Sequence, residues 1–199
     1  MASKFEMSDL RKLTYYLGIE VVQHEGGIVL KQDRYANRIL EETGMDLCNL
    51  THVPMEINAK FSIAPDEEKI DEKEYRRTIG CLRYLIHTRP DLSFSVGALS
   101  RYMQEPKAPH SSGLKQILRY LRGTCTLGLH YSRGHEARLM GYSDSSHNVD
   151  VDNGKSTSGH IFYCGECHVT WSSTKQEIVA LSSCEAEFMV ATEAAKQAI

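Results

Sequence analysis

The spacing of hydrophobic residues changes twice along the chain, and each change predicts a different kind of structure. Residues 14–22 are rich in β-branched and aromatic side chains, and apolar residues resume at 28–31 after a short polar stretch, which predicts a β-hairpin. Apolar side chains recur with helical spacing over 31–44, and a glycine ends this stretch. Residues 45–65 have no sustained period, so we expect an irregular connection there.

The middle of the chain has apolar residues at a spacing of three and four, which is typical of helices. Three consecutive helices are predicted, over about residues 71–88, 91–103 and 110–122. Pro90 is expected to end the first of them, because the residue before a proline disfavours helical geometry.

After Gly123 the period changes to two, which is typical of strands. Four short strands are predicted, at 127–132, 137–145, 159–164 and 168–173. The last stretch, 177–199, is rich in Ala and Glu and predicts a long helix that needs a packing partner. This order of elements predicts an α+β fold, in which the C-terminal part is an α+β unit or the first half of an α/β unit.

The composition is that of a globular protein. Hydrophobic residues make up 41% of the 199 residues and charged residues 25%, which excludes a collagen-like or disordered chain. The charge is unevenly distributed, although the net charge is only −3. Residues 76–133 contain ten Lys and Arg against two Asp and Glu, whereas the flanking stretches are acidic. Such a basic block predicts a surface that binds a polyanion.

Three cations are stacked along the third predicted helix. Lys115, Arg119 and Arg122 are spaced i, i+4 and i+7, opposite the apolar stripe. This arrangement is typical of a helix that faces phosphates, and equally of a basic face in contact with solvent. If the chain binds nucleic acid, we expect contacts from these three residues and from Arg76 and Arg83 on the first helix.

The sequence shows no sign of membrane insertion or secretion. No apolar run is long enough to span a membrane, and the N-terminal residues MASKFEMSDLRKL lack the apolar core of a secretory signal. We therefore expect a cytoplasmic or nuclear protein that is not secreted and has no membrane partner. Six cysteines without regular spacing fit this expectation as reduced thiols.

Three carboxylates are candidates for metal binding. Asp144 lies at the end of the predicted strand 137–145, and Glu185 and Glu187 lie on the predicted helix that follows the strands. A helix packed against the sheet would bring one of the two glutamates beside Asp144. Two such carboxylates would bind Mg²⁺ through oxygen ligands, which suits phosphodiester chemistry. The alternative is that these acids are solvated surface residues.

The acidic segment that begins at Asn148 does not match a calcium-binding loop. Asn153 stands where that loop requires glycine, and Gly159 stands where it requires the final glutamate. The sequence also lacks the Gly-x-Ser-x-Gly turn and the glycine-rich phosphate loop. Neither a serine hydrolase nor a P-loop protein is predicted.

A series of longer blocks carries a resemblance to one protein family. The chain is similar in sequence, over essentially its whole length, to the Pol polyprotein of copia-type LTR retrotransposons. The blocks that carry the similarity are, in order, FEMSDLRKLTYYLGIEV, YRRTIGCLRYLIHTRPDLSFSVGALSRYM, LKQILRYLRGT, GYSDSS, GKSTSGHIFYCG, VTWSSTKQ and VALSSCEAEFMVATEAAKQAI. So many blocks in one order are more specific than any single motif.

The resemblance implies a chain that begins just after the polymerase active site. The family's paired aspartates are expected upstream, because no Tyr-x-Asp-Asp string occurs here. Residues 1–136 would form the end of the palm with the thumb and connection, whose helices in the family hold the template–primer duplex. Residues 137–199 would form the first half of a ribonuclease H-like α/β unit, with a mixed sheet and its first helix.

The resemblance also implies roles for the acidic residues. In the family, ribonuclease H carboxylates hold Mg²⁺ ions that act on the RNA strand of an RNA–DNA hybrid. Asp144 matches the first-strand aspartate and Glu187 the first-helix glutamate, while Glu185 is an additional candidate in the same block. The remaining carboxylates of the family site lie downstream, so the chain is expected to be catalytically incomplete. Ser146 and His147 also replace an acidic and an aromatic residue of the family pattern.

The predicted function is that of a Pol polyprotein segment that binds a template–primer or an RNA–DNA hybrid together with the remainder of the polyprotein. One alternative is a Mg²⁺-dependent hybrid ribonuclease completed by further sequence, and another is a relic without function. The string Arg119-Tyr120-Leu121-Arg122 also fits the RxLR pattern of secreted effectors, a label that such chains can acquire by similarity. The lack of a signal peptide argues against secretion.

Overall fold

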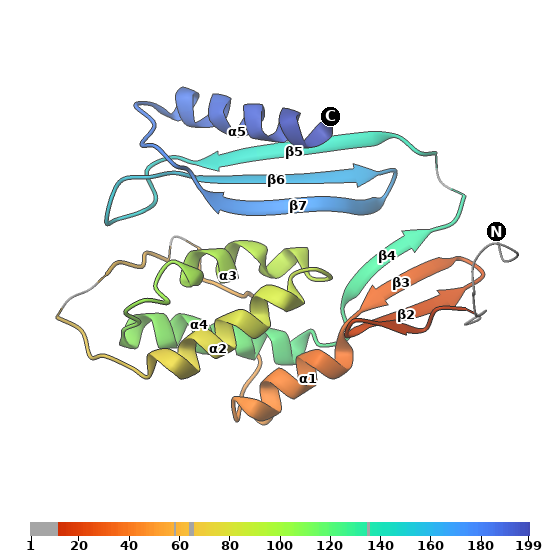
Figure 1. Ribbon diagram of the computed structural model, residues 1–199, viewed down its shortest axis with the longest axis horizontal. Helices are drawn as coiled ribbons and strands as arrows, with labels where there is room; N and C mark the ends of the chain where they lie inside the picture. Colours follow the sequence, from red (N-terminus) through yellow and green to blue (C-terminus); the bar gives the residue numbers. More distant parts are fainter. Residues whose placement is uncertain (1–11, 58, 64–65, 135) are drawn as a thin grey trace, which may run out of the picture.

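The computed structural model describes residues 12–57, 59–63, 66–134 and 136–199. Within these residues the protein is an α+β molecule that contains two antiparallel sheets and a group of packed helices (Figure 1). The first part of the family resemblance, residues 5–11, lies outside the described residues.

The described elements follow the order that the sequence predicts. The first part of the chain forms β1 (Tyr15–Tyr16), β2 (Ile19–His24), β3 (Gly27–Lys31), α1 (Asp33–Glu42), α2 (Glu72–Leu85), the 3₁₀ helix η1 (Pro90–Leu92), α3 (Ser93–Ser100) and α4 (Ala108–Gly123). The second part forms β4 (Gly128–Ser132), β5 (Leu139–Ser146), β6 (Thr157–Cys164), β7 (Cys167–Lys175) and α5 (Ser183–Ala198). The described residues of 45–65 form neither helix nor strand, which confirms the irregular connection.

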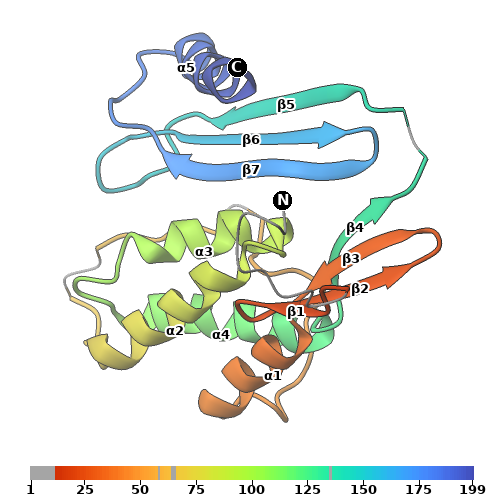
Figure 2. The same cartoon turned by 45° about the vertical axis from the view of Figure 1, so that its right-hand side comes forward.

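The N-terminal sheet joins strands that are far apart in sequence. Its order is β1-β2-β3-β4, and every pair is antiparallel. β3 pairs with β4 from Gly27 opposite Ser132 to Lys31 opposite Gly128, so α1–α4 are inserted between neighbouring strands (Figure 2). A side chain at Gly128 would come within 2.4 Å of the Leu30 carbonyl oxygen, so the strands can approach closely only with glycine there.

The inserted helices form the main hydrophobic core. Their apolar side chains recur every three or four residues, so each helix buries one face. This core includes Ala36, Ile39, Leu40, Ile79, Leu82, Leu85, Leu92, Val96, Leu99, Ile117, Leu118 and Leu121. Asp71 precedes α2, and its carboxylate accepts hydrogen bonds from the amides of Lys73 and Glu74 and so caps the helix.

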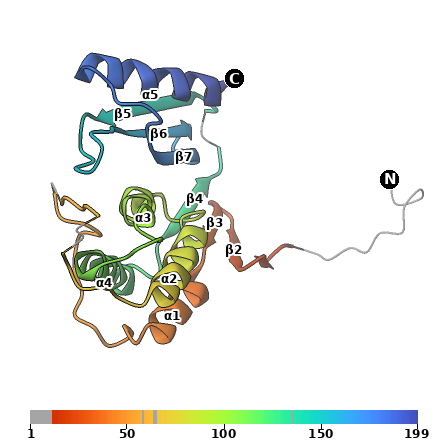
Figure 3. The ribbon, with the colours of Figure 1, turned by 60° about the vertical axis from the view of Figure 1, so that its left-hand side comes forward.

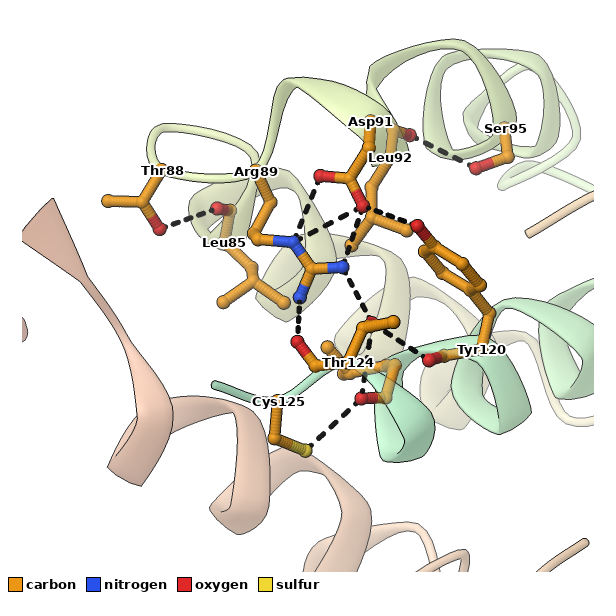
Figure 4. Close-up of polar contacts among 10 residues, drawn as sticks. Leu85, Thr88, Arg89, Asp91, Leu92, Ser95, Tyr120, Thr124 and Cys125 are labelled. Carbon is orange, nitrogen blue, oxygen red and sulfur yellow. Dashed lines mark hydrogen bonds and ion pairs between the residues drawn. The ribbon is translucent and has the colours of Figure 1, made fainter. Parts of the chain in front are cut away.

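Arg89 fastens η1 to the end of α4 (Figure 4). Its side chain is 2% exposed and donates from Nε and Nη2 to the two carboxylate oxygens of Asp91, at 2.9 and 2.6 Å. Nη1 donates to the Thr124 carbonyl at 2.8 Å and Nη2 to the Thr124 hydroxyl at 2.7 Å. The Tyr120 hydroxyl donates to the same Asp91 carboxylate. A buried guanidinium requires such partners, and here two separate elements supply them.

The C-terminal sheet has the order β5-β6-β7 and is antiparallel throughout its described strands. The expectation of a mixed sheet is therefore wrong for this part of the chain. Each strand reverses into the next without an intervening helix, whereas parallel strands need a crossover connection. α5 lies beside β5 and β6, and α3 lies beside β7, so the sheet separates α5 from the helical core (Figures 1 and 3).

α5 begins later than the predicted helix 177–199. Ser182 has an extended backbone, and its hydroxyl accepts a hydrogen bond from the amide of Glu185, which is a common way for a helix to start. Ile178 and Leu181 therefore precede the helix and are exposed. The buried residues of α5 are Ala186, Val190 and Ala194.

Polar contacts fasten the C-terminal sheet to the helical core. On β7, Trp171 Nε1 donates to the carbonyl of Ile86, just after α2, at 3.1 Å. The buried carboxylate of Asp150 forms ion pairs with Arg101 at the end of α3 and with Lys175 on β7, at 3.5 and 2.6 Å. The two ion pairs of Asp150 connect the loop after β5, the end of α3 and the strand β7 at one point.

Candidate functional site

Asp144 lies on β5, where it is opposite Gly159 of β6. Its side chain is exposed and makes no hydrogen bond or ion pair with other described residues. The carboxylate is therefore available to a cation or a hydrogen-bond donor from outside the chain.

Glu187 reaches the same strand from α5. Its Oε1 accepts a hydrogen bond from the amide of Ser145 at 3.2 Å, so the structure brings Glu187 to the residue that follows Asp144. The helix can approach the sheet closely because the residues on its buried face, such as the fully buried Ala186, are small. Sequence and structure thus place two carboxylates, one from a strand and one from a helix, in the same region.

Glu185 has a different role in the structure. Its Oε2 accepts a hydrogen bond from the amide of Leu181 at 2.6 Å, and its own amide donates to the Ser182 hydroxyl. Both bonds satisfy backbone groups at the start of α5, as a capping arrangement does. The carboxylate of Glu185 is therefore engaged at the helix terminus.

Gln176 positions α5 on the sheet, and sequence reasoning missed it. Its buried side-chain nitrogen donates to the Ser145 hydroxyl, the Ser158 hydroxyl and the carbonyl of Ala186, at 3.3, 3.0 and 3.1 Å. One amide thereby connects β5, β6 and α5 beside Glu187. A single glutamine that follows a strand carries no pattern in the sequence, so nothing there marks it.

The described residues do not by themselves form a metal centre. Nowhere among them do three or more His, Cys, Asp or Glu side chains gather as a metal site would require. Asp144 and Glu187 supply two carboxylates, and one of these already accepts a backbone hydrogen bond. Mg²⁺ keeps several waters and is often bound through one or two carboxylates, so this pair could supply ligands, but the site that the resemblance implies needs further carboxylates.

The basic face of α4 supports a neighbouring segment of the chain. Arg119 Nε donates to the carbonyl of Asn49 at 2.8 Å. Arg122 donates to the carbonyls of Asp46 and Cys48, at 2.5 and 2.6 Å. These two arginines hold the irregular segment after α1 against α4, a role that the helical spacing alone could not reveal.

The other predicted cations lie in different surroundings. Arg76 forms an ion pair with Glu72 at 2.8 Å and donates to the carbonyl of Met103 at 2.8 Å. Arg83 and Lys115 are exposed and form no hydrogen bond or ion pair with the rest of the described chain. The five predicted cations are therefore distributed over two helices with unequal freedom to bind a ligand.

Comparison with known proteins identifies the family. Residues 1–57 match the family model described as reverse transcriptase (RNA-dependent DNA polymerase). The chain is 39% identical over 188 residues to the retrovirus-related Pol polyprotein from transposon RE1 of Arabidopsis thaliana. The aligned region covers 94% of this chain. The chain is also 33% identical over 190 residues to an uncharacterized mitochondrial protein of the same plant, covering 94% of this chain and 78% of that protein. The chain belongs to the retrovirus-related Pol polyproteins of copia-type transposons.

This Pol-family chain spans 13% of the length of the RE1 polyprotein. It is also 44% identical over 126 residues to a protein named secreted RxLR effector protein 161 of Plasmopara viticola, covering 63% of this chain and 89% of that one. No solved structure matches the chain. In the described part of the chain, every helix is too short or too polar to cross a membrane.

Proposed function

We propose that this chain is part of the reverse transcriptase and ribonuclease H region of a Pol polyprotein, and that it binds a template–primer duplex or an RNA–DNA hybrid. Residues 1–136 would supply the palm end, thumb and connection, and residues 137–199 the first half of the ribonuclease H-like domain. The observation that carries the proposal is the basic block of residues 76–133, with ten Lys and Arg against two Asp and Glu. Most of this block lies on α2–α4.

The contacts of the cations support this proposal. Arg83 and Lys115 are exposed without an acidic partner among the described residues. Arg119 and Arg122 bond to carbonyl oxygens, which orient the guanidinium groups but leave their positive charge uncompensated. All four remain able to attract phosphates, and phosphate contacts dominate the affinity of proteins for nucleic acids.

The acidic pair supports a second candidate function. Because Glu187 lies against the residue after Asp144, this end of β5 could contribute two carboxylates to a Mg²⁺-dependent ribonuclease completed by further sequence. By itself the chain would bind a hybrid without cleaving it. Mg²⁺-dependent cleavage of the RNA–DNA hybrid that is lost in Asp144→Asn would favour the nuclease function over hybrid binding alone.

Salt-dependent binding tests the proposal. We expect a fluorescently labelled RNA–DNA hybrid to bind with an affinity that falls steeply between about 50 and 200 mM salt, because each phosphate contact releases counterions. The double variant Arg83→Gln/Lys115→Gln should reduce the slope of log affinity against log salt by about two.

The matched control is Arg77→Gln. Arg77 lies on the same helix as Arg83 but is paired with Glu42 at 2.5 Å, so its removal should leave the salt slope nearly unchanged. A folded protein that does not bind the hybrid at low salt would contradict the proposal and favour a relic without function.

A further inference from the structure

A groove lies between the helical core and the C-terminal sheet. It has a volume of about 780 Å³ and is walled by the end of α2, by α3, by β4 and by β7. Figure 2 shows α3 and β7 facing each other, with α5 at the far side of the sheet. Neither Asp144 nor Glu187 lines the groove, so it is separate from the carboxylate pair.

The lining of the groove favours an anionic ligand. The described lining residues include Arg83, His87, Arg101 and Lys175 but no Asp or Glu. Arg101 and Lys175 share the buried carboxylate of Asp150 behind the wall, whereas the exposed guanidinium of Arg83 lacks an acidic partner among the described residues. Hydroxyl groups supply further donors, among them those of Ser93, Ser172 and Ser173.

Aromatic side chains complete the lining. Trp171 and Tyr131 both line the groove. The hydrogen bond from Trp171 Nε1 to the Ile86 carbonyl fixes the indole between β7 and α2. Proteins that bind single-stranded nucleic acid combine such aromatic surfaces, on which bases stack, with a positively charged groove that follows the backbone.

We propose that this groove binds an unpaired stretch of nucleic acid, with Arg83 contacting a phosphate and Trp171 contacting a base. The volume lies within the roughly 300–1,000 Å³ of sites that hold small ligands, so it suits one or two unpaired nucleotides. The inference rests on the proposed function and refines the role of Arg83, which would contact the single strand where it continues from the bound hybrid.

The single tryptophan makes the proposal directly measurable. Trp171 is the only tryptophan in the sequence, so intrinsic tryptophan fluorescence reports on the groove alone. We expect a short oligothymidylate to change this fluorescence in a saturable, salt-sensitive manner. Arg83→Gln should weaken the oligothymidylate about fivefold or more at low salt, because one phosphate contact is lost.

Arg77→Gln is the matched control, because Arg77 lies on α2 but does not line the groove. This variant should bind the oligothymidylate as tightly as the wild-type chain does. Thymidine monophosphate should compete only weakly; strong competition would contradict a strand site and indicate a mononucleotide pocket. The inference would be overturned if Arg83→Gln and Arg77→Gln bound the oligothymidylate with equal affinity. It would also be overturned if the oligothymidylate left the tryptophan fluorescence unchanged while the labelled hybrid still bound. In both cases the proposed function would stand. Failure of both probes to bind would overturn the proposed function together with the inference.

Discussion

Arg89 shows how one buried cation can fix the geometry of a helical core. Its donors are divided between Asp91 on η1 and Thr124 after α4, so the side chain determines how these two segments meet. The charge is stabilised because the carboxylate binds it through two oxygens and because Tyr120 in turn donates to that carboxylate. The sequence marks this position only as the residue before Pro90.

The variant Asp91→Ala should lower the free energy of unfolding by about 2 kcal/mol, because a buried guanidinium loses charged hydrogen bonds while its Thr124 bonds remain. Urea denaturation measures this change. Arg77→Ala, which removes a solvent-exposed ion pair with Glu42, should lower the free energy of unfolding much less. If both variants lost the same free energy of unfolding, burial would not explain the stability that the Arg89–Asp91 pair provides.

His110 links the stability of the core to pH. The side chain is fully buried; its Nδ1 accepts from the Lys107 amide and its Nε2 donates to the Ser62 carbonyl, both at 2.9 Å. Burial lowers the pKa of His110 below its ordinary value, although the bond to Ser62 partly opposes this. The folded protein therefore binds fewer protons than the unfolded chain in mildly acidic solution.

Stability should fall as the pH decreases below about 6.5, where the unfolded histidine takes up a proton, and the loss should continue down to the lowered pKa of His110. The contribution is at most about 1.4 kcal/mol per pH unit. His110→Gln keeps an acceptor and a donor but does not titrate. Thermal unfolding at several pH values should thus show a weaker acid dependence in His110→Gln, and an identical dependence would exclude His110 as the cause.

At the scale of elements, α4 acts both as a core helix and as a support for the segment after α1. The Arg119 and Arg122 bonds to carbonyl oxygens are directional, whereas attraction to phosphates depends mainly on charge. These two roles can be separated experimentally because lysine preserves the charge but not the fork of donors.

The double variant Arg119→Lys/Arg122→Lys should keep the affinity for a hybrid within about twofold, since no charge is lost. Limited proteolysis should cut residues 46–57 faster than in the wild type, because the carbonyl contacts are lost. A large loss of hybrid affinity without faster cleavage would mean that the guanidinium groups contact phosphates directly.

The elements that the sequence predicts correctly are those determined locally. Helical spacing locates α1–α4 because each helix buries one face of its own residues. The pairing of β3 with β4 is not predictable in this way, since its two strands lie on either side of four helices. The start of α5 depends on the Ser182 hydroxyl, whereas the apolar residues Ile178 and Leu181 suggest an earlier start.

The candidate site, like the fold, could be predicted from the sequence only in part. The strand pattern and the family resemblance single out Asp144 and Glu187, and the structure brings Glu187 to the strand of Asp144. Gln176, which holds α5 on the sheet, and the groove around Trp171 depend on contacts between distant segments, which no local pattern encodes.

At the scale of the whole molecule, Asp150 fixes the sheet against the helices. Burial raises the pKa of Asp150, but the hydrogen bond and charge of Lys175, together with the Asn153 amide and the charge of Arg101, outweigh this effect and hold the pKa below its ordinary value. The carboxylate therefore stays charged at neutral pH, and its ion pairs with Arg101 and Lys175 keep the walls of the groove in place.

The insertion of α1–α4 between β3 and β4 has a consequence for the integrity of the fold. A single cut in the backbone between α1 and α2 would leave the shorter piece attached, because β3 remains hydrogen-bonded to β4 and because Ile39 and Leu40 remain buried in the shared core. The two pieces would separate only on unfolding. The molecule is thus held together across this connection by non-covalent contacts as well as by the chain itself.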